Sequence, residues 1–232
     1  MNKLYVDSFV EKNIKRGIQL LDGKDFHQLD LDNQLVALYN HSRQFLGTAY
    51  LSRQNKGIGW FLGNGKIDLT ESYFESLFSK AKQKRQHFEN SDLTTAYRLF
   101  NQDGDNFGGV TIDRYADFVV FSWYNTFVYQ YRDIIVKAFQ KVYYESAHIY
   151  GQEAPETFTI LENGVKYSVF MNDGLMTGIF LDQHEVRDAL INELGLGKRV
   201  LNMFSYTAAF SVAAAMGGAI ETTSVDLAKR SR

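Results

Sequence analysis

The chain has 232 residues, a length that suits one large domain or two to three small ones. Its composition is 45% hydrophobic and 15% aromatic, which excludes an intrinsically disordered chain. The net charge is −2 and there is no cysteine. The missing cysteine excludes disulfides, cysteine-based zinc sites and a cysteine nucleophile within these 232 residues.

Charge is distributed unevenly along the chain. Residues 1–90 carry 13 Lys and Arg against 10 Asp and Glu, whereas the rest carry 12 against 17. The basic excess in the first part is compatible with a polyanionic partner. The N-terminus has no apolar core of signal-peptide length, and no stretch approaches the roughly 20 apolar residues of a membrane span. We therefore expect a soluble, cytoplasmic protein with no membrane partner.

Residues 1–66 alternate short apolar runs with turn residues. The pattern predicts strands over 4–10, 34–40, 47–52 and 57–63, and a helix over 13–21. Closely spaced short strands are typical of a small barrel, so we predict a β-rich first domain.

Residues 67–156 mix helices and strands. Ser72 and Glu75 fit a capping box that starts a helix, and a second helix is predicted over 127–144. A hairpin is predicted over 96–124 and a short strand over 148–151. The loop at 103–108 superficially resembles a calcium-binding loop, but Phe107 and Arg114 occupy ligand positions, so we predict a plain turn. We expect a middle α+β domain.

Residues 157–232 begin with a hairpin over 157–170, followed by a helix over 182–194. A buried strand (199–204), a helix (208–216) and a second strand (220–226) then form a β–turn–helix–β unit. This order is the start of a doubly wound, Rossmann-like domain. Two parallel strands do not bury both faces of a sheet, so we expect either a piece of a longer chain or strands supplied from elsewhere. Its apolar strand residues would lie exposed, and we expect them to pair with other copies of the chain, as a homodimer or in aggregates.

The turn over 204–207 follows the first of these strands, and Asp226 ends the second. Ligands of open α/β sheets bind at the carboxyl ends of the strands, and an acidic residue there holds ribose hydroxyls. The turn lacks the G-x-G-x-x-G pattern that cradles a pyrophosphate. The pattern therefore favours S-adenosylmethionine (SAM) over a dinucleotide. The alternative is an ordinary β–α–β unit with a capping aspartate. The histidines show no metal-binding spacing, so no metal site is predicted.

Three segments make this interpretation more specific: TGIFLDQHEVR (177–187), VLNMFSYTAAFSVAAAMGGA (200–219) and SVDLAKRSR (224–232). They resemble the two-part SAM site of the large-subunit rRNA cytosine-C5 methyltransferases that carry an N-terminal PUA domain. Segment 97–120 resembles the hairpin of that family's middle domain, and 1–66 has the size of a PUA domain. The implied architecture is a PUA-like RNA-binding domain (1–66), an α+β middle domain (67–156) and the N-terminal part of a Rossmann-like methyltransferase domain (157–232).

The resemblance also implies the residues of the cofactor site. They are Asp182, Gln183, Arg187, Asn202, Phe204, Ser205, Tyr206, Thr207 and Asp226. On other grounds, Asp182 could be a helix N-cap, Arg187 part of a solvated helix face, and Phe204 a core residue. Two residues depart from the family pattern. Ala208 stands where the family usually has glycine, and His184 where arginine is common.

The family forms C5-methylcytosine through a cysteine thiolate that attacks C6 of the base. The resemblance places that cysteine and an Asp-Pro-Pro-type loop beyond residue 232, so the catalytic residues are not expected among these 232 and this chain is not expected to be active alone. The implied function is a SAM-dependent methyltransferase of large-subunit rRNA that acts on an extruded cytosine. Two alternatives stay open: a non-catalytic RNA-binding module, and a methyltransferase of another RNA base.

RNA contacts are expected from the first domain. Lys12, Lys15 and Arg16 gather there, in a small β domain of a kind that recognises RNA shape and backbone. The basic run at 80–85 could also contact phosphates, although the pattern favours a solvated helix end.

Overall fold

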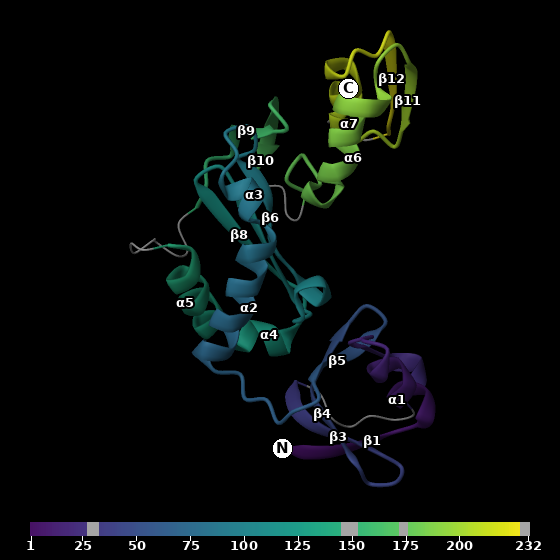
Figure 1. The fold of residues 1–232 in the computed structure, drawn as a ribbon, viewed down its shortest axis with the longest axis vertical. Coiled ribbons are helices and arrows are strands. Elements are labelled where there is room, and N and C mark those ends of the chain that lie inside the picture. Colours follow the sequence, from purple (N-terminus) through teal and green to yellow (C-terminus); the bar gives the residue numbers. More distant parts are fainter. Residues whose placement is uncertain (27–32, 145–152, 172–175, 228–232) are drawn as a thin grey trace. The chain divides into compact units, whose positions relative to one another are not determined.

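The computed structural model describes residues 1–26, 33–144, 153–171 and 176–227 (Figure 1). Its internal contacts divide the chain into two compact units. The first comprises Met1–Arg85, Leu99–Ile112 and Phe121–Tyr150, and the second comprises Gln86–Arg98, Asp113–Val120 and Gly151–Arg232. The division of the chain into domains at residues 66 and 156 stays a prediction.

A five-stranded sheet opens the first unit. Its order is β1 (Asn2–Val6), β3 (Gln34–Asn40), β4 (Phe45–Gln54), β5 (Gly57–Gly63) and β2 (Leu20–Asp22), and only β1 and β3 run parallel. Helix α1 (Ser8–Lys15) and a short 3-10 turn η1 (Gly23–Asp25) connect its first strands. The core on one face of this sheet includes buried side chains from β1, α1, β3 and β4: Val6, Val10, Ile14, Val36, Leu38 and Leu51.

Helix α1 corrects two predictions. The strand expected over 4–10 ends at Val6, and the helix expected over 13–21 begins at Ser8 and ends at Lys15. The reason is the side chain of Asp7, whose Oδ1 accepts the backbone N–H of Val10 at 2.8 Å and caps the helix start. Beyond the helix, Leu20 and Leu21 lie in strand β2.

Helices and three further strands follow. The helices are α2 (Glu71–Lys84), α3 (Gln86–Glu89), α4 (Thr126–Gln130) and α5 (Arg132–Tyr143), and β6 (Ala96–Asn101), β7 (Val110–Tyr115) and β8 (Phe118–Trp123) form one sheet in that order. The N-cap of α2 is Thr70 rather than Ser72, because the Thr70 hydroxyl accepts the Tyr73 N–H at 3.3 Å. The helix predicted over 127–144 is divided at Tyr131, and the strand predicted over 148–151 lies outside the described residues.

Strand β4 meets the loops between these strands through Tyr50. Its hydroxyl donates to the Gly108 carbonyl at 2.8 Å and accepts from Asn125 Nδ2 at 3.2 Å. Its ring lies 4.7 Å from that of Phe127 and 5.8 Å from that of Phe107. The phenol is fully buried, and burial raises its pKa well above the ordinary value. The second face of the sheet is therefore covered at this position.

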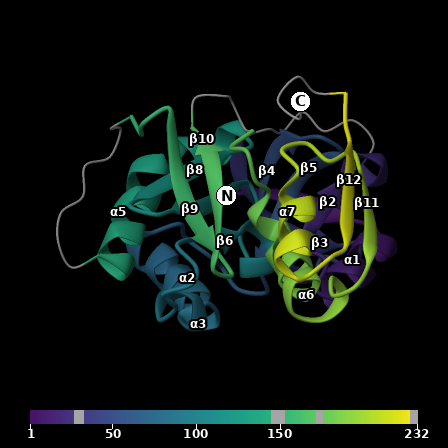
Figure 2. The same cartoon turned by 90° about the horizontal axis from the view of Figure 1, so that it is seen from above.

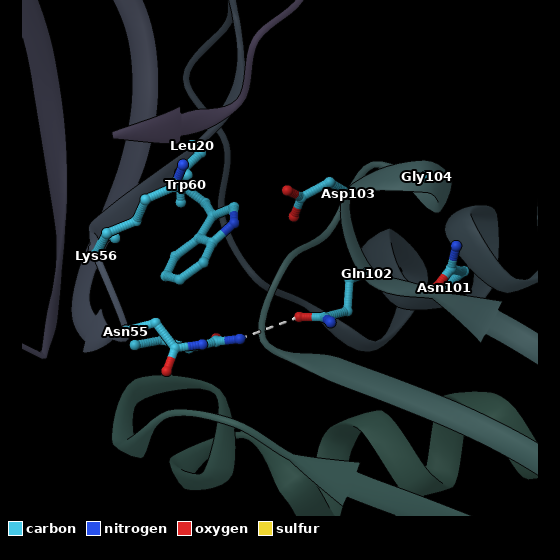
Figure 3. Close-up of a pocket in the computed structure, with 10 residues that line it drawn as sticks. Leu20, Asn55, Lys56, Trp60, Asn101, Gln102, Asp103 and Gly104 are labelled. Atoms are coloured by element: carbon cyan, nitrogen blue, oxygen red, sulfur yellow. Dashed lines mark hydrogen bonds between the residues drawn. The ribbon is translucent and has the colours of Figure 1, made fainter. Parts of the chain in front are cut away.

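Glycine makes this close packing feasible. A Cβ at Gly108 would lie 2.3 Å from the Trp60 ring and 2.6 Å from Asp103 Oδ1. Beside it, a pocket of about 340 Å³ is lined by both the sheet and the turn after β6, and the Trp60 ring faces the Asp103 carboxylate there (Figure 3). Its lining residues are Leu20, Gln54, Asn55, Lys56, Gly57, Trp60, Asn101, Gln102, Asp103 and Gly104.

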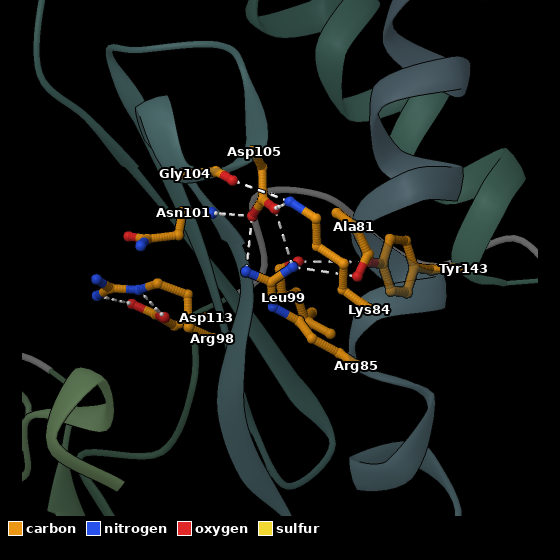
Figure 4. Close-up of polar contacts among 10 residues, drawn as sticks. All are labelled: Ala81, Lys84, Arg85, Arg98, Leu99, Asn101, Gly104, Asp105, Asp113 and Tyr143. Carbon is orange, nitrogen blue, oxygen red and sulfur yellow. Dashed lines mark hydrogen bonds and ion pairs between the residues drawn. The ribbon is translucent and has the colours of Figure 1, made fainter. Parts of the chain in front are cut away.

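The loop that resembles a calcium site is a 3-10 turn, η2 (Gln102–Asp105), as predicted. The Asp105 carboxylate is buried and receives Arg85 Nη2 at 2.7 Å, Lys84 Nζ at 2.9 Å and the Asn101 N–H at 2.7 Å (Figure 4). Desolvation opposes ionisation of Asp105, but these bonds outweigh it and lower its pKa. Two cations of the 80–85 run are thus used in an internal ion-pair cluster.

The second unit contains the hairpin of β9 (Thr157–Glu162) and β10 (Val165–Phe170). Asn163 and Gly164 at its tip have φ of 52° and 76°, as a type I′ turn requires. The hairpin packs into a core of buried residues that also includes parts of β7, the 179–181 segment and α7. Its members include Tyr115, Ile160, Val165, Val169, Ile179, Leu181 and Ala209.

The β–turn–helix–β unit is present in the second unit. A 3-10 turn η3 (Leu181–Gln183), helix α6 (His184–Ala189) and a π-helical turn η4 (Leu190–Leu194) lead to β11 (Arg199–Met203), α7 (Ala209–Met216) and β12 (Glu221–Val225). Figure 2 shows β11 and β12 side by side. The prediction of a buried strand was wrong: Leu201 is 63% exposed and Met203 51%. The separate expectation that the apolar side chains of this two-stranded sheet lie exposed is confirmed by the same two residues.

No helix in the described part of the chain is long and apolar enough to span a membrane.

Candidate functional site

The carboxyl ends of β11 and β12 lie next to each other. The strands are parallel, and their register runs from Arg199 opposite Glu221 to Met203 opposite Val225. The turn over 204–208 follows β11 directly, and Asp226 follows β12. The structure thus brings together the turn and the aspartate that the sequence analysis assigned to one site.

The turn has an uncommon backbone. Phe204, Tyr206 and Ala208 have φ of 57°, 52° and 61°, in the left-handed region that residues other than glycine rarely adopt. Each such residue costs about 1–2 kcal/mol. Strain of this kind persists where surrounding bonds enforce it, and it concentrates at functional sites.

Hydrogen bonds enforce this conformation. Asp226 Oδ2 accepts the backbone N–H of Tyr206 at 2.6 Å, and the Ser205 N–H donates to the Val225 carbonyl at 3.1 Å. The Ala208 N–H closes the turn onto the Ser205 carbonyl at 2.8 Å. The second strand therefore fixes the shape of the turn that follows the first.

A polar chain links the same two strands through α7. Asn202 Nδ2 donates to Ser211 Oγ at 3.1 Å, and the hydroxyls of Ser211 and Ser224 lie 2.6 Å apart. These bonds hold the start of α7 against both strands. Asn202 therefore holds the end of β11 and the start of α7 together beside the turn.

The 177–187 segment also contacts the turn. The Gly178 N–H donates to the Tyr206 hydroxyl at 3.0 Å, and Thr207 Oγ1 donates to the Gly178 carbonyl at 2.5 Å. The Phe180 and Tyr206 rings lie 5.5 Å apart. Gly178 has a φ of 91°, and a Cβ there would lie 2.9 Å from the Phe170 ring. The two motifs that carry the family resemblance are thus in direct contact.

Three of the expected site residues present polar or aromatic groups near the surface. Asp182 is exposed within η3, and Gln183 Nε2 donates to its Oδ2 at 3.4 Å. Phe204 is 89% exposed, so the alternative that it is a core residue was wrong.

Arg187 is buried, contrary to the alternative of a solvated helix face. Only 1% of its side chain is exposed, and its Nε and Nη2 donate to Glu162 Oε1 and Oε2 at 2.5 and 2.8 Å. Nη2 also donates to the Phe180 carbonyl at 2.8 Å. Arg187 thus ties α6 and the 180–183 segment to strand β9.

Glu162 is a residue that the sequence reasoning missed. Burial alone would raise the pKa of its carboxyl, but the paired Arg187 guanidinium lowers it below the ordinary value. A signal was available: Glu162 shares the inward face of β9 with Ile160, and an acidic residue at such a position needs a buried cation.

Ser205 carries a polar atom suited to a ligand. The residue is 6% exposed, and its Oγ has no hydrogen-bond partner among the described residues. Buried hydroxyls are normally paired, so an unsatisfied one in a strained turn fits a polar ligand atom. This observation fits a cofactor at the turn.

The expected RNA-binding cations lie in another part of the chain. Lys12, Lys15 and Arg16 are all exposed at the C-terminal end of α1. Lys15 Nζ pairs with Glu11 Oε1 at 2.6 Å, which offsets one of the three charges.

Two family models match the chain. Residues 4–64 match a PUA-like domain, and residues 125–232 match the S-adenosylmethionine-dependent methyltransferases. The second match includes the hairpin and the whole β–turn–helix–β unit, and it starts before the boundary predicted at residue 157. The PUA-like segment coincides with the five-stranded sheet.

Similar proteins agree with these matches. Bacillus subtilis YwbD, provisionally named a ribosomal RNA large subunit methyltransferase, is 40% identical over 94% of this chain and 61% of its own length. A Streptococcus mutans structure provisionally described as a SAM-dependent methyltransferase is 64% identical with a TM-score of 0.92, covering 100% of this chain and 65% of that one. A second structure, provisionally described as a methyltransferase complexed with SAH, is 64% identical with a TM-score of 0.91, covering 100% and 64%. The chain therefore spans less than two thirds of the length of these relatives.

Proposed function

We propose that this chain forms the cofactor-binding and RNA-binding parts of a SAM-dependent methyltransferase of large-subunit ribosomal RNA. The observation that carries the proposal is the left-handed turn over 204–208, fixed by Asp226 at the joined ends of two parallel strands. The name of the Bacillus subtilis relative and the SAH complex of the similar structure support it.

The proposed cofactor site consists of the residues around this turn. SAM supplies an activated methyl group when bound. A carboxylate has about four lone-pair sites, so the bond from Tyr206 does not exhaust the capacity of Asp226 to accept ribose hydroxyls. The buried Ser205 hydroxyl and the exposed Phe204 ring border the same turn.

The remaining residues of the proposed site act from its borders. Asp182 and Gln183 offer polar groups next to the Phe180–Tyr206 contact. Asn202 and Thr207 hold the turn, and Arg187 acts by fixing the Phe180 carbonyl.

RNA is the proposed second partner, with Lys12, Lys15 and Arg16 as phosphate contacts. All three are exposed in the PUA-like segment. Charge reversal at these positions should weaken RNA binding and flatten its salt dependence, because each phosphate contact releases counterions. Unchanged binding would remove them from the interface.

The finer target that we propose is C5 of cytosine. That reaction needs a nucleophile at C6 of the base, and these 232 residues contain no cysteine. In this proposal, the role of these 232 residues is to bind the methyl donor and the RNA. Mapping methylated bases of large-subunit rRNA in cells with and without the gene would identify the target; loss of a methyl group at another base would refute C5 specificity.

Titration calorimetry with SAM and SAH tests the cofactor site directly. We expect binding by the unaltered chain and at least tenfold weaker binding by Asp226→Asn and Asp226→Ala. The asparagine variant keeps an acceptor for the Tyr206 N–H but loses the charge and one acceptor. Intact, folded chain that binds neither SAM nor SAH would contradict the proposal and favour the non-catalytic RNA-binding alternative.

We further propose a cytoplasmic location and association of two copies through the exposed β11–β12 side chains. Light scattering checks the association, and a monomer at high protein concentration would contradict it.

A further inference from the structure

An exposed row of aromatic rings crosses three strands of the first sheet. Tyr5 on β1 is the register partner of Tyr39 on β3, and Tyr39 is the register partner of Phe45 on β4. The ring centroids are 5.8 Å apart for the first pair and 5.6 Å for the second. Tyr5 is 47% exposed and Phe45 42%. We call Tyr5, Tyr39 and Phe45 the aromatic row.

The row is not a displaced part of the core. Side chains alternate between the faces of a strand, and the neighbours Val6 and Leu38 belong to the buried cluster on the opposite face. On the row's own face, Tyr50 of β4 is fully buried against Phe107, which follows η2, and Phe127 of helix α4. The same sheet face is therefore covered at Tyr50 and open at the row.

A bulge in β4 brings Phe45 into the row. The register shifts between Leu38 and Tyr39, so that Leu38 opposes Gly47 and Tyr39 opposes Phe45. Gly47 has a φ of 151°, and a Cβ there would lie 2.1 Å from the Gly63 carbonyl oxygen. Only glycine fits at position 47. The bulge places Phe45 beside Tyr39 as the third ring of the row.

The charged side chains of these three strands and of the β3–β4 turn are all basic. Lys3 Nζ lies 5.3 Å from the centroid of the Tyr39 ring, and Arg43 is exposed in the turn that joins Tyr39 to Phe45. The three strands and the β3–β4 turn, residues 2–6 and 34–54, contain no Asp or Glu. A surface with basic side chains and no acidic ones complements a polyanion better than a protein surface of mixed charge.

We propose that the aromatic row is a stacking surface for the unpaired bases of single-stranded RNA, with Lys3 and Arg43 meeting the adjacent phosphates. Exposed rings in a basic surface are how proteins bind unpaired nucleotides, because every base has a face that stacks. Bases of a duplex are stacked on each other and do not reach such rings. This inference rests on the proposed function, in that it names how the RNA substrate is held.

The test compares ring loss with ring retention. The binding of a fluorescein-labelled single-stranded RNA dodecamer is measured by anisotropy for Tyr5→Leu, Tyr39→Leu and Phe45→Leu. Leucine keeps apolar area but removes the ring. We expect each to raise Kd about tenfold, within the range found for loss of a stacked base. Tyr5→Phe and Tyr39→Phe keep the ring and should bind within twofold of the unaltered chain.

Three controls sharpen the result. Phe9→Leu removes an aromatic ring that is 55% exposed on α1, outside the row, and should leave Kd unchanged. A duplex RNA of the same length should be insensitive to all three leucine changes. Lys3→Gln should reduce the slope of log Kd against log salt by about 0.7, the value for one phosphate contact on a single strand.

Equal RNA binding by the leucine variants and the unaltered chain would overturn the proposal, and so would equal losses for the leucine and phenylalanine variants. A change in self-association with RNA binding intact would show a protein interface instead. Calorimetry with SAM on the same preparations separates this outcome from failure of the proposed function. Intact SAM binding with no effect of the row refutes only the row, and absent SAM binding refutes the cofactor proposal regardless of the row.

Discussion

Strands β4 and β11 are both rich in apolar residues, yet their surroundings differ completely. Ala49, Tyr50 and Leu51 of β4 are all fully buried, whereas Leu201 and Met203 of β11 are 63% and 51% exposed. Strand β4 lies inside a five-stranded sheet with a core on one face and aromatic side chains packed on part of the other. Among the residues that the structure describes, strand β11 pairs only with β12. An apolar strand is stabilised by the layers that cover it, and its own composition does not supply them.

The two regions also use buried polar groups differently. In the first unit, Asp105 is tied to Arg85 and Lys84 and stabilises a turn between strands. In the second unit, Glu162 and Arg187 join a strand to the segment that borders the candidate cofactor site. The first pairing supports packing, and the second positions a proposed ligand surface.

The largest expected effect tests the comparison directly. Leu51→Ala should lower the free energy of unfolding by about 2–5 kcal/mol, because it opens a cavity in a covered strand. Leu201→Ala should change it by less than about 0.5 kcal/mol, as is usual for exposed positions. Scanning calorimetry of both variants measures the difference. Similar losses for the two would show that β11 is covered in solution.

Glu162→Gln should destabilise the second unit by about 3 kcal/mol, because it leaves the Arg187 guanidinium buried without its carboxylate. The pKa of Glu162 is lowered in the folded chain, so this stabilisation is fully present above the ordinary value near 4.5 and is lost as pH falls through the folded pKa. Acid titrations followed by circular dichroism should show this loss in the unaltered chain and its absence in Glu162→Gln. An unchanged acid transition in the variant would assign it to other carboxyls.

Gly108→Ala should cost about 1–3 kcal/mol, the range for overpacking, because its methyl group would meet the buried Trp60 ring. Gly65→Ala is the matched control, since a Cβ there would contact nothing within 4 Å. Urea unfolding of both variants measures the difference. An equal cost for both would mean that the loop after η2 moves freely away from the sheet.

The smallest expected effect has the opposite sign. Ala208→Gly should stabilise the second unit by about 1 kcal/mol, because Ala208 adopts a left-handed conformation that glycine adopts without strain. Thermal unfolding measures it, with Ala215→Gly in the exposed part of α7 as a control that should destabilise by a similar amount. Destabilisation by both would show that the turn relaxes when the alanine is present.

Much of this architecture could be predicted because its signals are local. The 157–170 hairpin follows from Asn163 and Gly164, and the β–turn–helix–β unit follows from apolar strands around a helix of small residues. Local signals gave the wrong helix start where a stronger capping residue lay nearby. Asp7 starts α1 inside a stretch that alternates like a strand, and Thr70 caps α2 two residues before Ser72.

What could not be predicted depends on residues far apart in the sequence. Burial of Arg187 requires Glu162, 25 positions away, and the shape of the 204–208 turn requires Asp226. The left-handed backbone of Phe204, Tyr206 and Ala208 has no local signal in the sequence, because none of these residues is glycine. The sequence located the candidate site, and the contacts that hold it became visible only in three dimensions.

Both tryptophans of the chain, Trp60 and Trp123, belong to the first unit. Selectively excited tryptophan emission therefore reports the unfolding of that unit alone, while the second unit contributes only tyrosine. Circular dichroism reports the helices and strands of both units. Transitions that coincide in the two signals would show a single cooperative molecule, and transitions that separate would measure the stability of each unit without cutting the chain.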